Sequence, residues 1–246
     1  MSRVIRAVTF DYWNTLIATP GDDYVRVRAE HWIRVLAEAG HDVSHDQLGT
    51  AFAASWATFQ EAWKANRQYQ TAESVADVLE LLDLAGEEEL AEVLVQDYEA
   101  GRVESDLVPT PNIGSTLEAL KAAGVKVGII CDVGVTPSVG LRSILERHDL
   151  LRHFDHHSFS DDVGIYKPDP RIFAHALEGL GSAPEETAHV GDLRRTDVAG
   201  ANGVGWTSVR YSGIFDDPGE RDGVQDVEAD HVIHDHADLP GALGIS

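Results

Sequence analysis

Two patterns of hydrophobic and polar residues distinguish one part of the chain from the rest. From about residue 21 to residue 103, apolar side chains recur at helical spacing, and no segment has the composition of a strand. This spacing predicts four helices, with Ser44 and Thr71 as the N-caps of two of them. The expected breaks between the helices are residues 40–44, 66–71 and 84–87.

On both sides of this helical block, short apolar runs indicate strands. The first run ends at Asp11, and the others follow Pro109, separated by amphipathic stretches that predict helices. Repeated strand and helix units imply a parallel sheet with right-handed crossovers. The later strands are expected at residues 125–130, 157–160, 187–190, 206–209 and 231–233, and the helices between them at 113–123, 136–148 and 169–179.

The predicted fold class is therefore α/β, with a doubly wound, Rossmann-like parallel sheet core and an inserted all-helical cap domain. We assign residues 1–18 and 106–246 to the core and residues 19–105 to the cap. A helical block placed between the first strand and the remaining strands is typical of a lid over the strand ends.

Composition and charge narrow the range of partners. A chain of 246 residues can bury a core, and 43% apolar with 25% charged residues is typical of a soluble globular protein. The 42 acidic residues outnumber the 19 basic ones, and the resulting net charge of -23 argues against nucleic acid or a membrane surface as a partner. We expect a small-molecule substrate, and a phosphorylated one requires local positive charge or a metal.

The single cysteine, Cys131, cannot form an intrachain disulfide, which is typical of a reducing compartment. No apolar stretch approaches the roughly 20 residues of a membrane span. The first residues lead into a strand instead of a signal peptide. These features predict a cytoplasmic protein, which we expect to be a monomer or a homodimer.

Residues with catalytic potential follow the predicted strands. Because the carboxyl ends of parallel strands lie at one edge of a sheet, these side chains are expected to converge. A carboxylate cluster suits Mg²⁺, and a lysine adds the positive charge that phosphoryl transfer requires. Asp11, directly after the first strand, is the candidate nucleophile. The converging residues are Asp11, Cys131, Asp132, Lys167, Asp192 and Asp197.

Four segments, FDYWNTL, GIICD, YKPDPRIF and HVGDLRRTD, resemble the four ordered motifs of the haloacid dehalogenase superfamily. The helical insert resembles the C1-type cap of that family, and the resemblance covers nearly the whole chain. It implies that Mg²⁺ is bound by Asp11, by Asp192 and by the backbone carbonyl of Trp13. The catalytic residues that it implies are Asp11 as the nucleophile, Cys131 where the family usually has Ser or Thr, Lys167, and Asp197 as the second acid of motif IV.

One departure from the family pattern leaves three functions open. Phosphatases of the family usually have an aspartate two residues after the nucleophile as general acid, and Trp13 stands there. Dehalogenases of the family also lack this aspartate, but Asp192 favours the metal-dependent phosphatases. The predicted function is a hydrolase that acts through an aspartyl-phosphate on a small phosphorylated metabolite. The alternatives are a 2-haloacid dehalogenase-type C–X hydrolase with Asp11 as nucleophile, and a catalytically weakened, ligand-binding relative.

Other polar residues are candidates for substrate binding or for the protein surface. An arginine at the start of the cap could clamp a phosphate or carboxylate, although a solvated helix face also explains it. Three histidines near the C-terminus have spacing that could bind a metal, but surface positions are expected for them. The predicted substrate-binding residues are Trp13, Asn14, Thr15, Asp132 and Arg26, and the three histidines are His231, His234 and His236.

Overall fold

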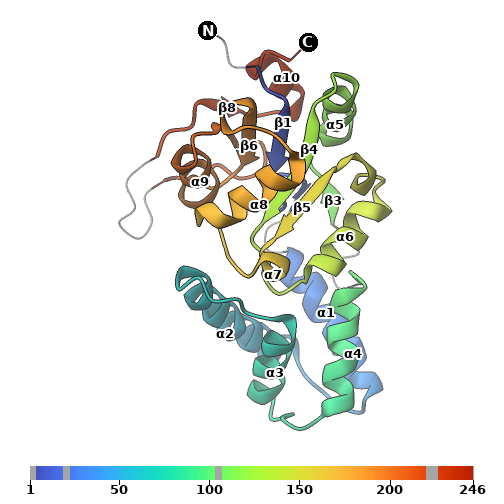
Figure 1. Cartoon of the computed structure of the whole chain (residues 1–246). Helices are drawn as coiled ribbons and strands as arrows, with labels where there is room; N and C mark the ends of the chain where they lie inside the picture. The colour runs from blue at the N-terminus through green and yellow to red at the C-terminus, as the bar shows by residue number, and fades with distance from the viewer. Residues whose placement is uncertain (1–3, 19–22, 103–106, 220–226, 246) are drawn as a thin grey trace. The chain divides into compact units, whose positions relative to one another are not determined.

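A computed structural model describes residues 4–18, 23–102, 107–219 and 227–245, which form two compact units (Figure 1). We call them the core unit and the cap unit. The core unit is Met1–Ala18, Val108–Asp132 and His148–Ser246, and the cap unit is Thr19–Leu107 and Val133–Arg147. This division differs from the sequence-based one because residues 133–147 group with the cap unit. The expected boundary at residues 105 and 106 lies outside the described residues.

Six parallel strands form the sheet of the core unit, in the order β5-β4-β1-β6-β7-β8. β1 is central, and the chain moves outward from it first on the β4 side and later on the β6 side. This reversal is the topological switch point at which open α/β sheets bind ligands. The strands are β1 (Ala7–Phe10), β4 (Lys126–Cys131), β5 (His156–Phe159), β6 (Thr187–Gly191), β7 (Thr207–Tyr211) and β8 (His231–Ile233).

Helices cover both faces of this sheet, which confirms the predicted α/β class. α8 (Pro170–Leu180) and α9 (Ala199–Gly203) pack against each other and lie on the same side in Figure 1. α5 (Ile113–Ala122) and α10 (Leu239–Ala242) pack against each other. Because right-handed crossovers to the two sides of β1 pass over opposite faces, α5 and α9 belong to different layers.

Apolar side chains hold the α8 layer against the strands. Phe173 of α8 contacts the ring of Trp206 edge to face, with ring centroids 5.5 Å apart. β1, β4, β6 and β7 are almost entirely buried, which explains why they are continuous apolar runs in the sequence. The short elements of the core unit are β2 (Ile17–Ala18), which pairs with β3 (Val108–Pro109), and α7 (Ser160–Val163).

The cap unit contains the four helices predicted for it and also α6, the helix that the sequence predicts at residues 136–148 within the core. Ser44 caps α2 in a capping box with Gln47. The N-cap of α3 is Gln70 and not Thr71, because the Thr71 hydroxyl donates to the carbonyl of Val135, 2.7 Å away. The helices are α1 (Asp23–Glu38), α2 (His45–Lys64), α3 (Thr71–Leu81), α4 (Glu88–Glu99) and α6 (Ser138–Arg147).

Apolar packing holds the helices of the cap unit together. Trp32, Leu36 and Leu48 are among the residues of its buried cluster, which includes side chains of α1 to α4. α6 lies against α4 at Gly140, where a Cβ atom would be 2.2 Å from the carbonyl oxygen of Tyr98. Glycine is therefore required at this contact.

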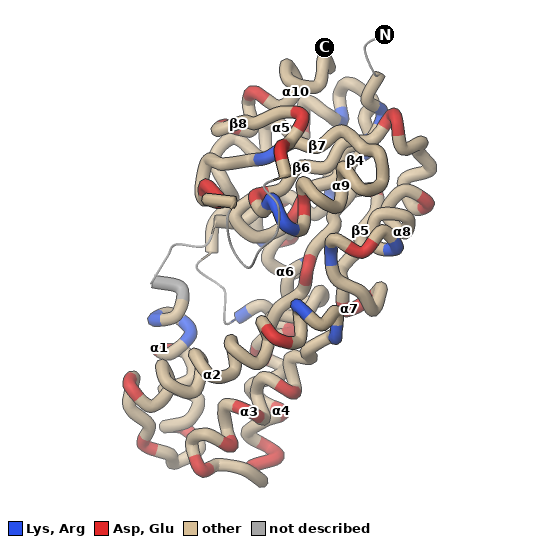
Figure 2. Tube along the Cα trace, turned by 90° about the vertical axis from the view of Figure 1, so that its left-hand side faces the viewer, with Lys and Arg blue, Asp and Glu red and all other residues tan. Residues whose placement is uncertain are grey.

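The charged residues of α3 and α4 are all acidic, and both helices carry red segments in Figure 2. Among the described residues, no helix combines the length and the apolar character needed to cross a membrane.

Candidate active site

Four charged side chains that are distant in the sequence meet at the carboxyl edge of the sheet. Lys167 Nζ lies 2.5 Å from Oδ1 of Asp11 and 2.6 Å from Oδ1 of Asp197. Carboxylate oxygens of Asp11, Asp192 and Asp197 lie within 4.8 Å of one another. All four side chains are buried. The structure therefore brings together the acids and the lysine that the sequence places after different strands.

Asp197 has a donor on each of its oxygens. Oδ1 accepts hydrogen bonds from Lys167 and from Nε2 of His189, at 2.6 and 3.1 Å, and Oδ2 accepts one from the backbone N–H of Leu193 at 2.9 Å. Its approach depends on Gly191, because a Cβ there would lie 2.2 Å from Cγ of Asp197. Because Asp197 is held by these bonds, it can fix the orientation of the Lys167 ammonium group beside Asp11.

His189 belongs to this network and was not singled out from the sequence. Its Nδ1 lies 2.8 Å from the hydroxyl of Thr9, its register partner on β1. Since Nε2 faces a carboxylate, Nε2 carries the hydrogen and Nδ1 accepts from Thr9. Burial lowers the pKa of His189, so the ring is neutral. Thr9 and His189 are polar residues within otherwise apolar strand segments. Because buried polar groups require partners, their position in the sequence could have indicated this hydrogen bond.

Charge is not balanced within the cluster, which contains three carboxylates and one ammonium group. Burial raises the pKa of Asp11 to about 7 against the opposing attraction of Lys167. Burial and the charge of Asp11 also raise the pKa of Asp192 well above its usual range. Burial opposes ionisation of Asp197, but Lys167 and His189 outweigh it and lower its pKa. The acids that lack a full set of donors are therefore Asp11 and Asp192.

The loop after β1 presents three of the predicted substrate-binding residues. Asn14, in the left-handed region with φ +56°, donates from Nδ2 to Oδ2 of Asp192 at 3.4 Å. Trp13 is partly buried, and its ring contacts Tyr12 edge to face at 5.1 Å. The Thr15 hydroxyl is buried without a hydrogen-bond partner among the described residues. Asn14 thus ties the loop to the acid that follows β6.

Asp132 and Cys131 lie at the end of β4, as the sequence indicates. Asp132 Oδ1 accepts a hydrogen bond from the backbone N–H of Lys167 at 2.8 Å, so this carboxylate fixes the backbone that carries the lysine. Cys131 is fully buried, and burial together with Asp11 raises the pKa of its thiol. The protonated thiol is a weak donor and a poor nucleophile.

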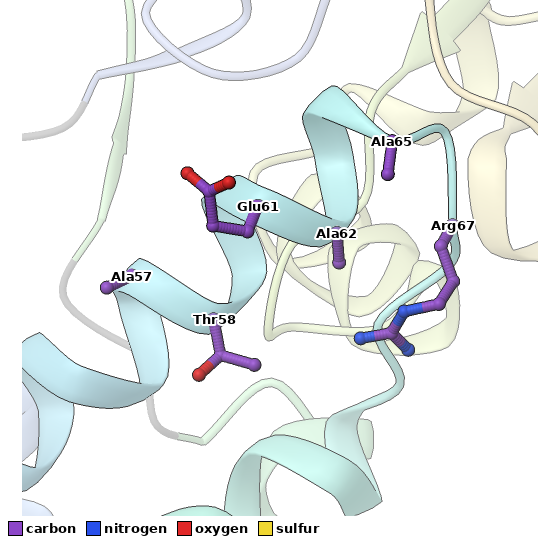
Figure 3. Close-up of a pocket in the computed structure, with 6 residues that line it drawn as sticks. All are labelled: Ala57, Thr58, Glu61, Ala62, Ala65 and Arg67. Carbon is purple, nitrogen blue, oxygen red and sulfur yellow. The ribbon is translucent and has the colours of Figure 1, made fainter.

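Arg26 lies in the cap unit, and its guanidinium pairs with Glu30 one helical turn later, at 2.5 Å. Both side chains are about half exposed, which is typical of a solvated helix face. The cap unit also contains a cavity of about 540 Å³ beside α2 (Figure 3). Its lining consists of Ala57, Thr58, Glu61, Ala62, Ala65 and Arg67, none of which is a predicted site residue.

One of the three C-terminal histidines departs from the surface position expected for it. His236 is fully buried, and its Nε2 lies 2.8 Å from the carbonyl oxygen of Thr15. His234 is exposed, as expected, and its Nδ1 lies 2.7 Å from the Ser212 hydroxyl. The burial of His236 depends on a contact across 221 positions, which spacing within the C-terminal segment cannot reveal.

Comparisons with known proteins identify relatives with hydrolytic activities. Residues 5–205 match the family model of the haloacid dehalogenase-like hydrolases. A glyceraldehyde 3-phosphate phosphatase of Methanopyrus kandleri is 30% identical over 92% of this chain and 94% of that protein. An (S)-2-haloacid dehalogenase of a Pseudomonas species is 28% identical over 85% of this chain and 86% of its own length. The crystal structure of a HAD phosphatase from Thermococcus onnurineus superimposes with a TM-score of 0.67 and 26% identity, over 98% of this chain and 99% of that one.

Proposed function

The chain belongs to the haloacid dehalogenase-like hydrolase family, as its motifs predict, and we propose that it is a Mg²⁺-dependent phosphatase that acts on small phosphorylated metabolites. The name of its relative in Methanopyrus kandleri supports phosphate ester hydrolysis. The observation that carries the proposal is the buried cluster of Asp11, Asp192 and Asp197, with Lys167 as its basic partner. Haloacid hydrolysis by a metal-free enzyme would not need this excess of negative charge.

The donor set fits a small, hard dication. Asp197 already accepts three hydrogen bonds, from Lys167, His189 and a backbone N–H, so the acids that would hold Mg²⁺ are Asp11 and Asp192. The backbone carbonyl of Trp13 is the third ligand that we propose. Oxygen ligands of this kind match the preference of Mg²⁺, and a dication would offset the two carboxylates. When bound, Mg²⁺ supplies charge that neutralises the oxygens of the phosphoryl group.

The proposed reaction has two steps at phosphorus. A carboxylate oxygen of Asp11 attacks the phosphorus atom, the bond to the leaving oxygen breaks, and an aspartyl-phosphate forms. Water then attacks the phosphorus of this intermediate, which releases inorganic phosphate and restores the carboxylate. Lys167 places its ammonium group beside Asp11, where it stabilises the negative charge of the transferring group. Asp197 and Asp132 hold Lys167 in that position, through its ammonium group and its backbone N–H.

Trp13 sets the leaving-group preference in this proposal. The indole N–H does not act as a general acid, so the departing oxygen takes its proton from water. Loss of a general acid costs roughly 10² to 10⁴ in rate for poor leaving groups and little for good ones. We expect aryl and acyl phosphates to be hydrolysed far faster than alkyl phosphates such as glyceraldehyde 3-phosphate.

Replacement of the tryptophan tests this account. Trp13→Asp should raise turnover of alkyl phosphates at least about tenfold while aryl phosphate turnover changes little. Steady-state phosphate release from glyceraldehyde 3-phosphate and from p-nitrophenyl phosphate gives both numbers. Equal rates on the two substrates in the wild-type protein would mean that another residue donates the proton.

A metal-removal experiment tests the proposed function itself. The wild-type protein should release phosphate from p-nitrophenyl phosphate with Mg²⁺, and EDTA should abolish the release. Asp11→Asn should be inactive, whereas Asp46→Asn, which alters an acid of the first turn of α2, should keep full activity. Phosphate release that persists in EDTA or in Asp11→Asn would contradict the proposal.

A 2-haloacid dehalogenase is the second candidate, because Trp13 replaces the usual acid and dehalogenases are among the relatives. In that case a carboxylate oxygen of Asp11 displaces halide from carbon, and water hydrolyses the resulting ester. Metal-independent halide release from 2-chloropropionate, without phosphate release from p-nitrophenyl phosphate, would favour this function. If neither product is detected, the protein is a ligand-binding relative.

A further inference from the structure

The C-terminal segment reaches back to the loop that follows the nucleophile strand. We call residues 11–16 the nucleophile loop. His236 lies on the short helical turn His236–Asp238, well beyond the residues 5–205 that match the family model. Its Nε2 is 2.8 Å from the carbonyl oxygen of Thr15 in this loop. Because a carbonyl oxygen can only accept, Nε2 carries the hydrogen and donates it.

The surroundings of His236 hold the ring in one orientation. The ring of Tyr211 stacks on it with centroids 4.0 Å apart and an interplanar angle of 19°, and Phe10 contacts it edge to face at 6.2 Å. The preceding residue, Asp235, accepts from Nδ2 of Asn112 on both carboxylate oxygens at 2.9 Å. The stacking on Tyr211 and the hydrogen bonds between Asp235 and Asn112 hold the ring so that the Nε2–H group donates to the Thr15 carbonyl.

The Thr15 carbonyl oxygen accepts the side-chain hydrogen bonds that hold the nucleophile loop. It accepts a second hydrogen bond from the Thr110 hydroxyl at 2.7 Å, so two side chains fix the plane of the peptide between Thr15 and Leu16. The N–H of that same peptide, on Leu16, donates to the carbonyl of Tyr12 at 2.9 Å and closes the loop. A rotation of this peptide would therefore open the turn that begins next to Asp11.

The loop in turn positions groups beside the acids. Asn14 N–H donates to the carbonyl of Ile17 at 2.7 Å, and the Asn14 side chain reaches Asp192. The backbone of Trp13 lies between Asn14 and the closing carbonyl of Tyr12. The orientation of the Thr15 peptide therefore affects where the loop places the Asn14 side chain relative to Asp192.

We propose that His236 is a positioning residue that holds the nucleophile loop in its catalytic form through the Thr15 carbonyl. The kinetic part of this inference rests on the proposed function, whereas the structural part does not. Without the donor, one of the two bonds to a buried carbonyl is lost, and the loop samples open forms. Small displacements of reacting groups cost roughly 10- to 100-fold in rate.

Two variants separate hydrogen bonding from packing. His236→Phe keeps an aromatic ring against Tyr211 but has no donor, and His236→Gln supplies an N–H at the reach of Nε2. The control is His234→Gln, since His234 is exposed in the same segment. Hydrogen exchange of a peptide covering residues 11–18 reports loop opening, and kcat and KM for p-nitrophenyl phosphate report catalysis.

We expect about tenfold faster exchange at Leu16 in His236→Phe, with kcat lowered at least about tenfold and KM within about twofold of wild type. His236→Gln should restore both values, and His234→Gln should change neither. Wild-type exchange in a folded His236→Phe protein would overturn the proposal, as would an equal loss in His236→Phe and His236→Gln. A wild-type protein without phosphate release would refute the proposed function alone, because the exchange measurement still tests the loop.

A substitution at Thr110 covers the case in which His236→Phe does not fold. Thr110→Val removes the other donor to the Thr15 carbonyl at nearly constant volume. It should accelerate exchange at Leu16 in the same way, with His236 still in place. Unchanged exchange in Thr110→Val would show that this carbonyl does not control the loop.

Discussion

Each unit of the molecule contains an aspartate that is bonded to a histidine and to a basic side chain. In the core unit, Asp197 contacts Lys167 at 2.6 Å and His189 at 3.1 Å. In the cap unit, Asp97 contacts Arg102 at 2.5 Å and His31 at 3.0 Å. The residue types and distances are nearly the same, so any difference in behaviour must come from the surroundings.

Solvent exposure separates the two clusters. The side chain of Lys167 is 2% exposed, whereas that of Arg102 is 65% exposed and remains hydrated. Exposed ion pairs stabilise a protein by about 0 to 1 kcal/mol, but a buried charge that loses its partner is strongly destabilising. Asp97 is itself buried, so the two clusters differ in the basic partner, which is hydrated in the cap unit and desolvated in the core unit.

Matched substitutions should reveal this difference most strongly. Asp197→Asn removes a buried carboxylate that accepts hydrogen bonds from Lys167, His189 and the backbone of Leu193, and we expect it to lower the free energy of unfolding by about 3 kcal/mol. It should also lower kcat, because Lys167 loses its orientation. Asp97→Asn should cost less, about 1 to 2 kcal/mol, because Arg102 remains solvated and the main loss is the bond from the buried carboxylate to His31. Urea unfolding of both variants measures the contrast, and equal losses would remove the distinction between the clusters.

A pH experiment examines another buried polar group of the core unit. Burial lowers the pKa of His236 to about 4, from 6.5 in an unfolded chain. Between these values the unfolded state binds more protons, so the contribution of His236 is complete above pH 6.5 and is lost as the pH falls toward 4. The loss amounts to about 3 kcal/mol. His236→Gln should flatten this part of the stability curve measured by urea unfolding, and an unchanged slope would contradict the assignment.

Substitutions at two glycines, one in each unit, should give the smallest changes in the free energy of unfolding. Gly191→Ala places a Cβ 2.2 Å from Cγ of Asp197, and the resulting overpacking should cost about 1 to 3 kcal/mol and lower kcat. Gly49 lies inside α2 of the cap unit, and a Cβ added there would meet no atom within 4 Å, so Gly49→Ala should stabilise the helix by about 0.5 to 1 kcal/mol. Thermal unfolding distinguishes the two signs. A stabilised Gly191→Ala would mean that Asp197 does not need this close approach.

The elements that could be predicted are those whose burial follows a simple period. β1 and β6 are buried on both faces and are therefore unbroken apolar runs, and the helices of the cap unit bury one stripe each. The convergence of Asp11, Lys167 and Asp192 could also be predicted, because parallel strands end at one edge. Local rules and strand direction were sufficient for these features.

The features that could not be predicted depend on contacts between distant residues. Thr71 is a good N-cap by composition, but its hydroxyl bonds to Val135 instead. His236 has the polar neighbours of a surface residue, yet it stacks on Tyr211 beneath the nucleophile loop. The grouping of residues 133–147 with the cap unit likewise depends on the packing of α6 against α4. The spacing of residues within one element of the sequence cannot reveal these long-range contacts.

The bond from His236 to Thr15 has a practical consequence for anyone who shortens or fuses this chain. A fragment ending at residue 205 would keep all four family motifs and still lack the histidine that anchors the loop beside Asp11. The motif boundaries therefore do not mark a minimal catalytic fragment. Tags and fusion partners are better attached after α10, which packs against β8 and α5.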